Sequence, residues 1–413
     1  MRGRGNPREF VLFQSLNSLQ DCLFLLISLI SGRKIPLVWI LGSTPFNADL
    51  VSEIKRAVSI PVIAVGRFTE LQYAELLVKQ GRADLIAFGR QSIADPELPN
   101  KARLGMLEEL VPCIGCLLGC VPNMFAGKPI TCALNPSVGR ESEMTPAETK
   151  KRVVVVGGGP AGLYAAWVCA VRGHKVTLLE KNHEPGGSFR IASYPVGKGQ
   201  ISAAVRAMIV RCGRAGVEIR TDTEATPGYI RSLTPDAVIL ATGSVPFMSP
   251  VPGISDCGCV TAQDMLEGKV PVGKKVIVAG GGMIGCETAE YLAERGHQVA
   301  IVEMKSVIAK DVAPENRRYM FENFARNHVQ LYPDAKIEQF YSDGVSCTGR
   351  DGSPFSLRGY DNIVLTMGTR AWNPLEEALS EFVPQVFVIG EALHSPGNAV
   401  TATADALDAA LSV

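Results

Sequence analysis

The stretch that decides the fold is KRVVVVGGGPAG, residues 151–162. Its valines predict a buried strand, and the glycines that follow predict the start of a helix. In this arrangement Gly157 allows a tight turn, Gly159 lets backbone N–H groups approach a pyrophosphate, and Gly162 allows close helix–strand packing. The helix N-terminus then favours the negative charge. Glu180 ends the next predicted strand, 23 residues after Gly157, where an acid can hold a ribose hydroxyl. The stretch therefore predicts a dinucleotide site.

The same pattern recurs about 120 residues later, as VIVAGGGMIG followed by the predicted strand VAIV. Gly280, Gly282 and Gly285 take the three glycine positions, and Glu303 again follows 23 residues after the first of them. An acid at this position bonds the adenosine ribose and repels a 2′-phosphate, so NADH is favoured over NADPH. Lys305 lies close by in the sequence and would soften that repulsion.

Two such units predict two dinucleotides in one chain. The simplest pairing places FAD on the first unit and the nicotinamide nucleotide on the second. Ala-Thr-Gly at 241–243 and Thr-Met-Gly at 366–368 each follow a predicted strand and indicate crossovers between two domains, with ordinary strand-end turns as the alternative. Residues 363–366 and 386–389 are expected to be strands that return to the first unit.

Residues 151–413 resemble the two-dinucleotide flavoprotein superfamily, in which the nucleotide domain is inserted into the FAD domain. Gly186 and Gly187 resemble its second FAD glycine motif. The sequence VIGE at 388–391 resembles its late FAD motif, although the superfamily usually has Asp where this chain has Glu391. The resemblance implies FAD contacts at Gly187, Gly243, Gly390 and Glu391.

Many members of that superfamily pass electrons to a redox dithiol, and this sequence offers none. No cysteine lies between Cys169 and Cys212, where the disulfide reductases carry theirs. Cys257 and Cys259 have the wrong spacing for a C-x-x-C pair, so we interpret both as structural. Electrons must therefore leave FAD by another route.

A group of four cysteines offers that route. Cys113, Cys116, Cys120 and Cys132 have the spacing C-x2-C-x3-C-x11-C. Thiolates are soft ligands, suited to iron–sulfur clusters or to zinc. Structural zinc sites usually pair two short knuckles across a longer gap, so the spacing favours a [4Fe–4S] cluster, with zinc or no metal as the alternatives.

The residues around these cysteines carry a second resemblance. The segments CIGC, GC and GKPITCALNP closely resemble the cluster loop of the 2,4-dienoyl-CoA reductase, enoate reductase and trimethylamine dehydrogenase family. The N-terminal domain of that family is an FMN-binding TIM barrel, similar to old yellow enzyme. The resemblance implies a [4Fe–4S] cluster on the four cysteines. It also implies FMN contacts at Arg67, Gly89 and Arg90, which follow the ends of two predicted strands.

Only part of such a barrel precedes Cys113. Residues 60–65 and 84–88 predict two parallel strands, with a helix at 69–80 between them. A TIM barrel needs roughly 250 residues and eight strands. The remaining strands carry most FMN contacts and the substrate pocket in the family, and they have no counterpart here. We expect a truncated or broken reading frame, in which FMN binding is in question and the final substrate stays open.

The predicted fold is α/β, with two Rossmann-like dinucleotide-binding domains, the nucleotide domain being inserted in the FAD domain. An iron–sulfur loop and the last two strand–helix units of a truncated TIM barrel precede them. The expected divisions are an unassigned N-terminal segment at 1–45, the barrel remnant at 46–110, the cluster loop and linker at 111–150, the FAD domain at 151–250 and 356–413, and the NAD(P)H domain at 251–355.

Charge and composition narrow the range of partners. Lys+Arg and Asp+Glu are equal at 41 each in the 413 residues, so the formal net charge is zero. This balance gives no electrostatic reason to expect nucleic acid or an acidic membrane surface as a partner. The apolar run at 22–30 is too short to span a bilayer, and no A-x-A cleavage pattern follows it. A cytoplasmic location and a small-molecule substrate are expected, and the sequence is compatible with a homo-oligomer.

These patterns predict an NAD(P)H-dependent flavin oxidoreductase. Hydride is expected to pass from NADH to FAD, and single electrons from FAD to the cluster. In the parent family the route continues to FMN and to an enoate or enoyl-CoA C=C bond. The alternatives are an electron-transfer subunit that serves a separate barrel-bearing protein, and a non-functional fragment. No catalytic residue can be assigned from the sequence.

Overall fold

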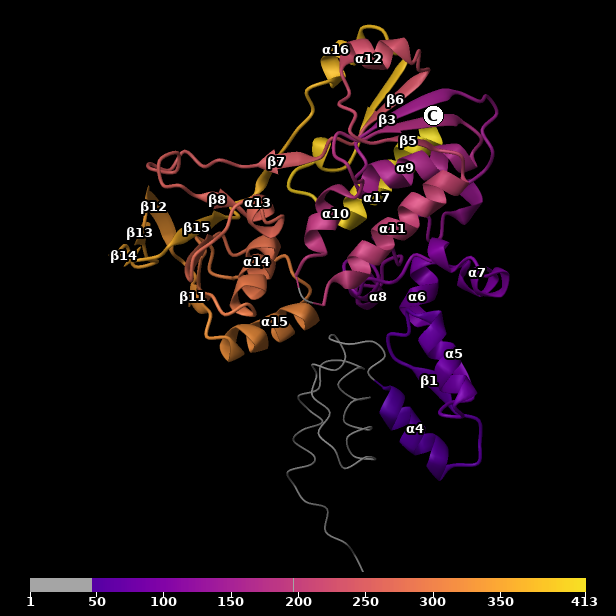
Figure 1. The fold of residues 1–413 in the computed structure, drawn as a ribbon, viewed down its shortest axis with the longest axis horizontal. Coiled ribbons are helices and arrows are strands. Elements are labelled where there is room, and N and C mark those ends of the chain that lie inside the picture. Colours follow the sequence, from indigo (N-terminus) through magenta and orange to yellow (C-terminus); the bar gives the residue numbers. More distant parts are fainter. Residues whose placement is uncertain (1–46, 196) are drawn as a thin grey trace, which may run out of the picture.

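The computed structural model describes residues 47–195 and 197–413. Two five-stranded parallel sheets dominate it, and a smaller N-terminal segment precedes them (Figure 1). The predicted segment at 1–45, with the apolar run at 22–30, lies outside the described residues. No helix in the described part is both long and apolar enough to cross a membrane.

The N-terminal described segment alternates helices with short strands. Its elements are α4 (Ala48–Ala57), β1 (Ile63–Val65), α5 (Leu71–Lys79), β2 (Leu85–Ala87), α6 (Gly89–Ala94), α7 (Leu98–Leu104) and η1 (Leu107–Glu109). β1 and β2 pair in parallel, with Ile63 opposite Leu85, as predicted for the last two strand–helix units of a barrel. A small core that includes Val51, Phe68 and Leu77 packs α4 and α5 against these strands.

The segment from η1 to the first large sheet has little regular structure and contains the four cysteines. Its helical elements are α8 (Val121–Phe125) and η2 (Glu141–Glu143). Buried Val111 and Leu134 pack against Ala204 and Ala207 of the long helix α11 (Gly199–Arg214). The cysteine loop is therefore anchored on the first dinucleotide unit.

The first large sheet has the strand order β17-β6-β3-β4-β5, and all its pairings are parallel. Its strands are β3 (Arg152–Val156), β4 (Lys175–Leu179), β5 (Glu218–Arg220), β6 (Ala237–Leu240) and β17 (Gln385–Val388). Its helices are α9 (Pro160–Val171), α10 (Gly187–Ala192), α11, α12 (Pro227–Ser232), α16 (Glu376–Ser380), η3 (Gly390–Ala392) and α17 (Ala399–Ser412). Most of α9 is buried because it packs against the sheet, α11 and α17.

The second large sheet has the strand order β11-β10-β9-β15-β8, again with parallel pairings only. Its strands are β8 (Val260–Thr261), β9 (Lys275–Ala279), β10 (Gln298–Val302), β11 (Gln330–Tyr332) and β15 (Asn362–Leu365). Its helices are α13 (Ala262–Leu266), α14 (Met283–Ala293) and α15 (Pro314–Arg326). An antiparallel layer covers one face and consists of β12 (Lys336–Tyr341), β13 (Gly344–Thr348) and β14 (Pro354–Arg358).

Strand β15 corrects one prediction. Residues 363–366 are predicted to return to the first unit, but β15 pairs with β9 and β8 of the second sheet. The second unit therefore extends past the expected boundary at 355, to the end of β15. The apolar residues Ile363, Val364 and Leu365 suit a central strand of either sheet, so composition does not select between the two sheets. The other predicted return strand, at 386–389, is β17 and does pair with β6 of the first sheet.

Two short strands connect the units. β7 (Ser244–Pro246) and β16 (Thr369–Ala371) follow directly after the predicted crossover segments and pair antiparallel, with Ser244 opposite Ala371. The segment that leaves the first unit therefore lies beside the segment that returns to it. β7 lies between the two sheets in Figure 1. This topology confirms that the second unit is inserted into the first.

Candidate functional site

The first glycine loop joins β3 to α9 and shows the close contacts that the sequence predicts. A Cβ atom on Gly162 would lie 1.9 Å from the carbonyl oxygen of Gly157, so no side chain fits there. A Cβ on Gly157 itself would lie 2.4 Å from the oxygen of Ala241. Around a Cβ on Gly159, by contrast, no described atom beyond its chain neighbours lies within 4 Å. The start of α9 therefore offers open space where a pyrophosphate would approach the helix N-terminus.

The two predicted ribose acids hold their glycine loops in the same way. Glu180 Oε2 accepts a hydrogen bond from the N–H of Gly158 at 2.8 Å, and Glu303 Oε2 accepts one from Gly281 at 2.7 Å. In each acid the other oxygen, Oε1, accepts a hydrogen bond from the backbone N–H of the residue two positions later in the chain, at 2.8 Å. Both acids are buried. They fix the loops, and their contact with a ribose stays a prediction.

The second glycine loop, from β9 to α14, repeats this geometry with one addition. A Cβ on Gly285 would lie 2.0 Å from the oxygen of Gly280. Gly282 is the N-cap of α14, and the next residue, Met283, donates its N–H to Oδ2 of Asp311 at 3.0 Å. Sequence motifs do not single out Asp311, because an exposed acid in the loop after β10 carries no signal of its own.

The late motif lies beside the first glycine loop. Glu391 accepts hydrogen bonds from the hydroxyl of Ser244 at 2.9 Å and from the N–H of Gly397 at 3.2 Å. Gly390 donates its N–H to Asp405 of α17 at 3.1 Å. Ser244 and Asp405 therefore position the motif. Both are distant from it in the sequence, so local patterns could not identify them.

The remaining predicted FAD residues lie near the first glycine loop and the late motif. A Cβ on Gly187 would lie 3.0 Å from the Cα of Gly159, and a Cβ on Gly390 would lie 3.3 Å from the Cβ of Ala161. Gly243 directly precedes Ser244, which bonds the late motif. The structure thus brings the predicted FAD residues together from parts of the chain that are far apart. Contact with FAD itself stays a prediction.

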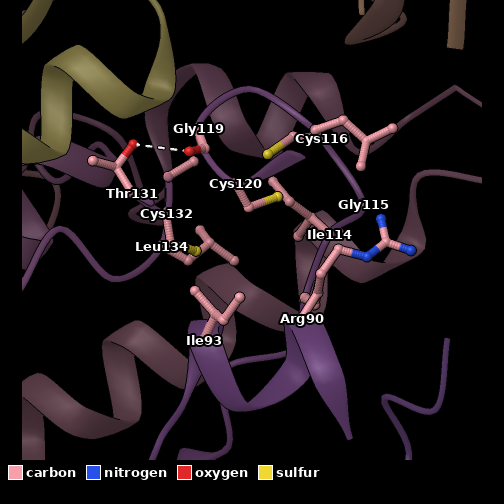
Figure 2. A pocket seen from close by; sticks show the side chains of 13 residues that line it. Arg90, Ile93, Ile114, Gly115, Cys116, Gly119, Cys120, Thr131, Cys132 and Leu134 are labelled. Atoms are coloured by element: carbon pink, nitrogen blue, oxygen red, sulfur yellow. Dashed lines mark hydrogen bonds between the residues drawn. The ribbon is translucent and has the colours of Figure 1, made fainter. Parts of the chain in front are cut away.

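The four cysteines predicted to hold metal line one pocket (Figure 2). All four are half-buried free thiols, and Figure 2 shows Cys116, Cys120 and Cys132 directed into the space beside α6. Burial raises the pKa of the Cys132 thiol to about 12, and burial also raises the pKa of Cys116, which lies near Cys113 and Cys120.

The donor set of this pocket is four soft thiols, which suits an iron–sulfur cluster by ligand chemistry. Within residues 47–195 and 197–413, however, no three His, Cys, Asp or Glu side chains are arranged to hold a single metal ion. The structure therefore brings the four predicted ligands to one pocket. That they bind an iron–sulfur cluster stays a prediction.

Buried side chains of α6 and its surroundings fix the entrance to the cysteine loop. The Gln91 amide donates to the oxygen of Val111 at 2.9 Å, and its oxygen accepts from the N–H of Cys113 at 2.8 Å. Asp95 accepts from the N–H of Val111 at 2.9 Å and pairs with Lys101 at 2.6 Å. The glutamine, the aspartate and the lysine are all buried. A buried polar network of this kind orders a loop because each unmade bond would be costly.

The two arginines predicted to contact FMN face the cysteine loop. Arg90 lines the pocket together with the cysteines. Arg67 donates to Oε1 of Gln200 in α11 at 3.0 Å, and a Cβ on Gly115 would lie 2.7 Å from Nη2 of Arg67. Burial and the nearby Arg90 lower the pKa of Arg67, whereas Cys113 raises it. Positive charge therefore lies beside the predicted cluster ligands, and FMN contact by these arginines or Gly89 stays a prediction.

Cys257 and Cys259 form a disulfide in the structure. The bond lies in the loop that precedes β8, and Cys257 is buried in the core between the second sheet and its antiparallel layer. Its position supports the interpretation of both residues as structural.

Comparison with known proteins assigns the chain to a family. The model of the pyridine nucleotide-disulphide oxidoreductase family matches residues 151–406. The chain belongs to this family. The model of the NADH:flavin oxidoreductase / NADH oxidase family matches residues 40–109, the part that contains β1, β2 and the two arginines.

Individual relatives match most of this chain, more than either family model covers alone. NADH oxidase from Thermoanaerobacter brockii is 42% identical over 354 residues, which cover 84% of this chain and 54% of the relative. Cinnamate reductase from Clostridium sporogenes is 33% identical over 355 residues, which cover 84% of this chain and 52% of the relative. The structure of a 2-naphthoyl-CoA reductase complex superposes with a TM-score of 0.85 at 31% identity, over 89% of this chain and 56% of that one. The chain thus spans about half the length of the curated relatives it matches.

These matches confirm the resemblance drawn from the glycine and cysteine motifs. The chain is a member of the old-yellow-enzyme-like flavoenzymes that carry a pyridine nucleotide oxidoreductase unit. The two family models imply a flavin and NADH as cofactors.

Proposed function

We propose that this flavoenzyme oxidises NADH and passes the electrons by way of FAD toward a [4Fe–4S] cluster. The first glycine loop and the late motif would hold FAD, and the second glycine loop would hold NADH. Cys113, Cys116, Cys120 and Cys132 would hold the cluster. A flavin supplies the required chemistry, because it accepts two electrons together and releases them singly. The observation that carries the proposal is that four thiols line a pocket anchored on the helix α11 of the first dinucleotide unit.

Ion pairs between the two dinucleotide units support hydride transfer from one to the other. Lys198, just before α11, pairs with Glu287 of α14 at 2.7 Å. Arg190 of α10 pairs with Glu267, the C-cap of α13, at 2.8 Å. Both pairs are partly shielded from solvent. They hold the second unit against the helices that follow the first glycine loop, which is the arrangement that a transfer between two bound cofactors requires.

An anaerobic assay of NADH oxidation with ferricyanide as artificial acceptor tests the proposal. We expect the purified chain to contain flavin and to turn over NADH. The double variant Cys116→Ser/Cys120→Ser should lose its iron and keep most of the ferricyanide activity, because ferricyanide can take electrons from the flavin directly. A chain without flavin absorbance that oxidises no NADH would refute the proposal.

The onward acceptor in a complete assembly is proposed from the relatives. One relative is named as a cinnamate reductase and one solved structure as a 2-naphthoyl-CoA reductase complex. An enoate or an enoyl-CoA is therefore the substrate class that we propose. This chain would supply its electrons, with FMN in a barrel as the last carrier.

A second candidate function is that of an electron-transfer subunit for a separate barrel-bearing protein. The N-terminal two-stranded sheet favours it, because Ile63, Val65 and Leu85 in its strands are between 55% and 57% exposed. Parallel sheets are normally buried on both faces, so this surface suits a partner that provides further strands. Affinity capture followed by an enoate reduction assay separates the outcomes. A captured flavoprotein that restores reduction supports the subunit, whereas a second copy of this chain or no partner contradicts it.

A further inference from the structure

The two glycine loops share one register and can be compared position by position. Three pairs have a constant offset of 123 residues: Gly157 with Gly280, Glu180 with Glu303, and Gly186 with Ala309. The N–H of Gly186 donates to the oxygen of Gly158 at 2.7 Å, and the N–H of Ala309 donates to the oxygen of Gly281 at the same distance. In both units, therefore, the loop after the second strand folds back onto the glycine loop in the same way.

Within this register the first unit has no acid at the position that Asp311 takes in the second unit. Its helix α9 begins with Pro160, which has no N–H to donate. Ser188, an exposed and uncharged residue, is the nearest counterpart of the acid found in the other unit. A Cβ on the N-cap Gly159 would meet no described atom within 4 Å beyond its chain neighbours.

The second unit has an acid at the matching place. Met283 stands where the first unit has Pro160, and Asp311 stands where it has Ser188. Oδ2 of Asp311 accepts the Met283 N–H at 3.0 Å and lies 3.5 Å from the position of a Cβ on Gly282. The carboxylate is thus bonded to the N–H group at the start of α14, where a phosphate would be expected.

We propose that Asp311 occupies the pyrophosphate position of the second unit and weakens nucleotide binding there. This inference rests on the proposed function, since it takes the second glycine loop as the NADH site. It explains how two similar loops serve two different purposes. The first binds a cofactor that stays in place, and the second binds a substrate that must leave after each turnover.

The physical basis is a competition between two anions for one helix start. The partial positive charge of a helix N-terminus stabilises a carboxylate as it stabilises a phosphate. An incoming nucleotide must displace the carboxylate from Met283, and its phosphates are repelled by the displaced charge nearby. A nucleotide in the first unit meets no such competitor at Gly159.

Anaerobic calorimetric titration of the purified chain, with its flavin reduced beforehand by dithionite so that it accepts no hydride, tests the inference with NADH, ADP-ribose and adenosine as the probes. Asp311→Asn and Asp311→Ala should each bind NADH and ADP-ribose roughly 2- to 10-fold more tightly than the wild type. Adenosine has no phosphate, so its affinity should not change. Glu315→Gln removes one negative charge from the first turn of α15 and serves as the control for net charge.

The reciprocal substitution is made in the first unit. Ser188→Asp should lower the FAD content of the purified protein, whereas Ser188→Asn, of similar size and no charge, should not. Equal affinity of the wild type and both Asp311 variants for NADH would overturn the inference alone. Weaker NADH binding by the variants would also overturn it, because Asp311 would then bind the nucleotide. No binding of NADH by any chain would refute the proposed function together with the inference.

Discussion

At the scale of single residues, the glycine loops depend on positions where the residue has no side chain. Gly162 and Gly285 allow the helix to lie against the preceding turn, where a Cβ would come within 2.0 Å of a carbonyl oxygen. A real Cβ essentially never approaches backbone so closely, so any substitution must push the helix outward. A displaced helix start no longer directs its N–H groups at a phosphate.

The substitution Gly162→Ala tests this dependence. We expect it to lower the free energy of unfolding by about 1–3 kcal/mol, because overpacking forces backbone shifts, and to reduce the flavin content. Urea unfolding and the flavin absorbance of the purified protein measure both effects. Gly228→Ala is the matched control, since a Cβ there meets no described atom within 4 Å beyond its chain neighbours and the backbone of its own helix α12. Equal losses in the two variants would contradict the account.

Glu303 has two tasks that substitutions can separate. It bonds the glycine loop through the N–H groups of Gly281 and Lys305, and it is predicted to repel a 2′-phosphate. Glu303→Ala should lower the preference for NADH over NADPH roughly tenfold, measured as the ratio of the two kcat/KM values. Glu303→Gln keeps one hydrogen-bonding oxygen and should shift the preference in the same direction with less loss of stability. Unchanged kinetics with both nucleotides would refute the role.

At the scale of elements, the cysteine loop is the part whose order depends most on side chains outside the motif. The cysteine spacing predicts that four thiols meet, and the structure places them around one pocket. Gln91 fixes the entrance of the loop from α6, and the guanidinium of Arg67 lies close to Gly115, between the first two cysteines. The loop therefore retains its shape through a buried amide and a guanidinium.

The substitution Gln91→Leu tests this anchoring. It leaves the oxygen of Val111 and the N–H of Cys113 without their partner, which should cost about 1–3 kcal/mol of stability. The iron content per chain should fall as the loop loosens. Gln72→Leu, at an exposed position on α5, is the control and should change neither quantity. Full iron content in Gln91→Leu would show that the cysteines alone order the loop.

Sequence patterns predict which segments form strands and helices better than they predict which elements and side chains pair with one another. The strands β3 and β9 and the helices after them follow from valine runs and glycine spacing, which are local signals. β15 is assigned to the wrong sheet because an apolar strand does not encode which neighbour it pairs with. Asp311 and Gln91 escape notice for a similar reason, since their role exists only once distant backbone groups are brought beside them.

At the scale of the whole molecule, buried thiols link stability to pH. Cys169 and Cys212 lie in the core of the first unit, and burial raises the pKa of each thiol to about 12. A thiol in an unfolded chain has a pKa of about 8.5. Between these values the unfolded chain binds fewer protons than the native chain, so stability falls as the pH rises.

The alkaline loss of stability can be measured directly. Above about pH 9 each of these thiols should lower the free energy of unfolding by about 1.4 kcal/mol per pH unit. Urea unfolding of the chain at a series of pH values from 7 to 10 gives the slope. Cys169→Ala/Cys212→Ala should have a shallower slope, even if its stability at pH 7 is lower. An identical slope in the double variant would assign the effect to other groups.

Cofactor stoichiometry is the measurement that tests the central claim most directly. An anaerobic absorption spectrum of the purified chain, with flavin identified by chromatography and iron quantified, counts every proposed group at once. The account predicts one FAD and four iron atoms per chain. Protein that is folded but carries neither flavin nor iron would contradict it.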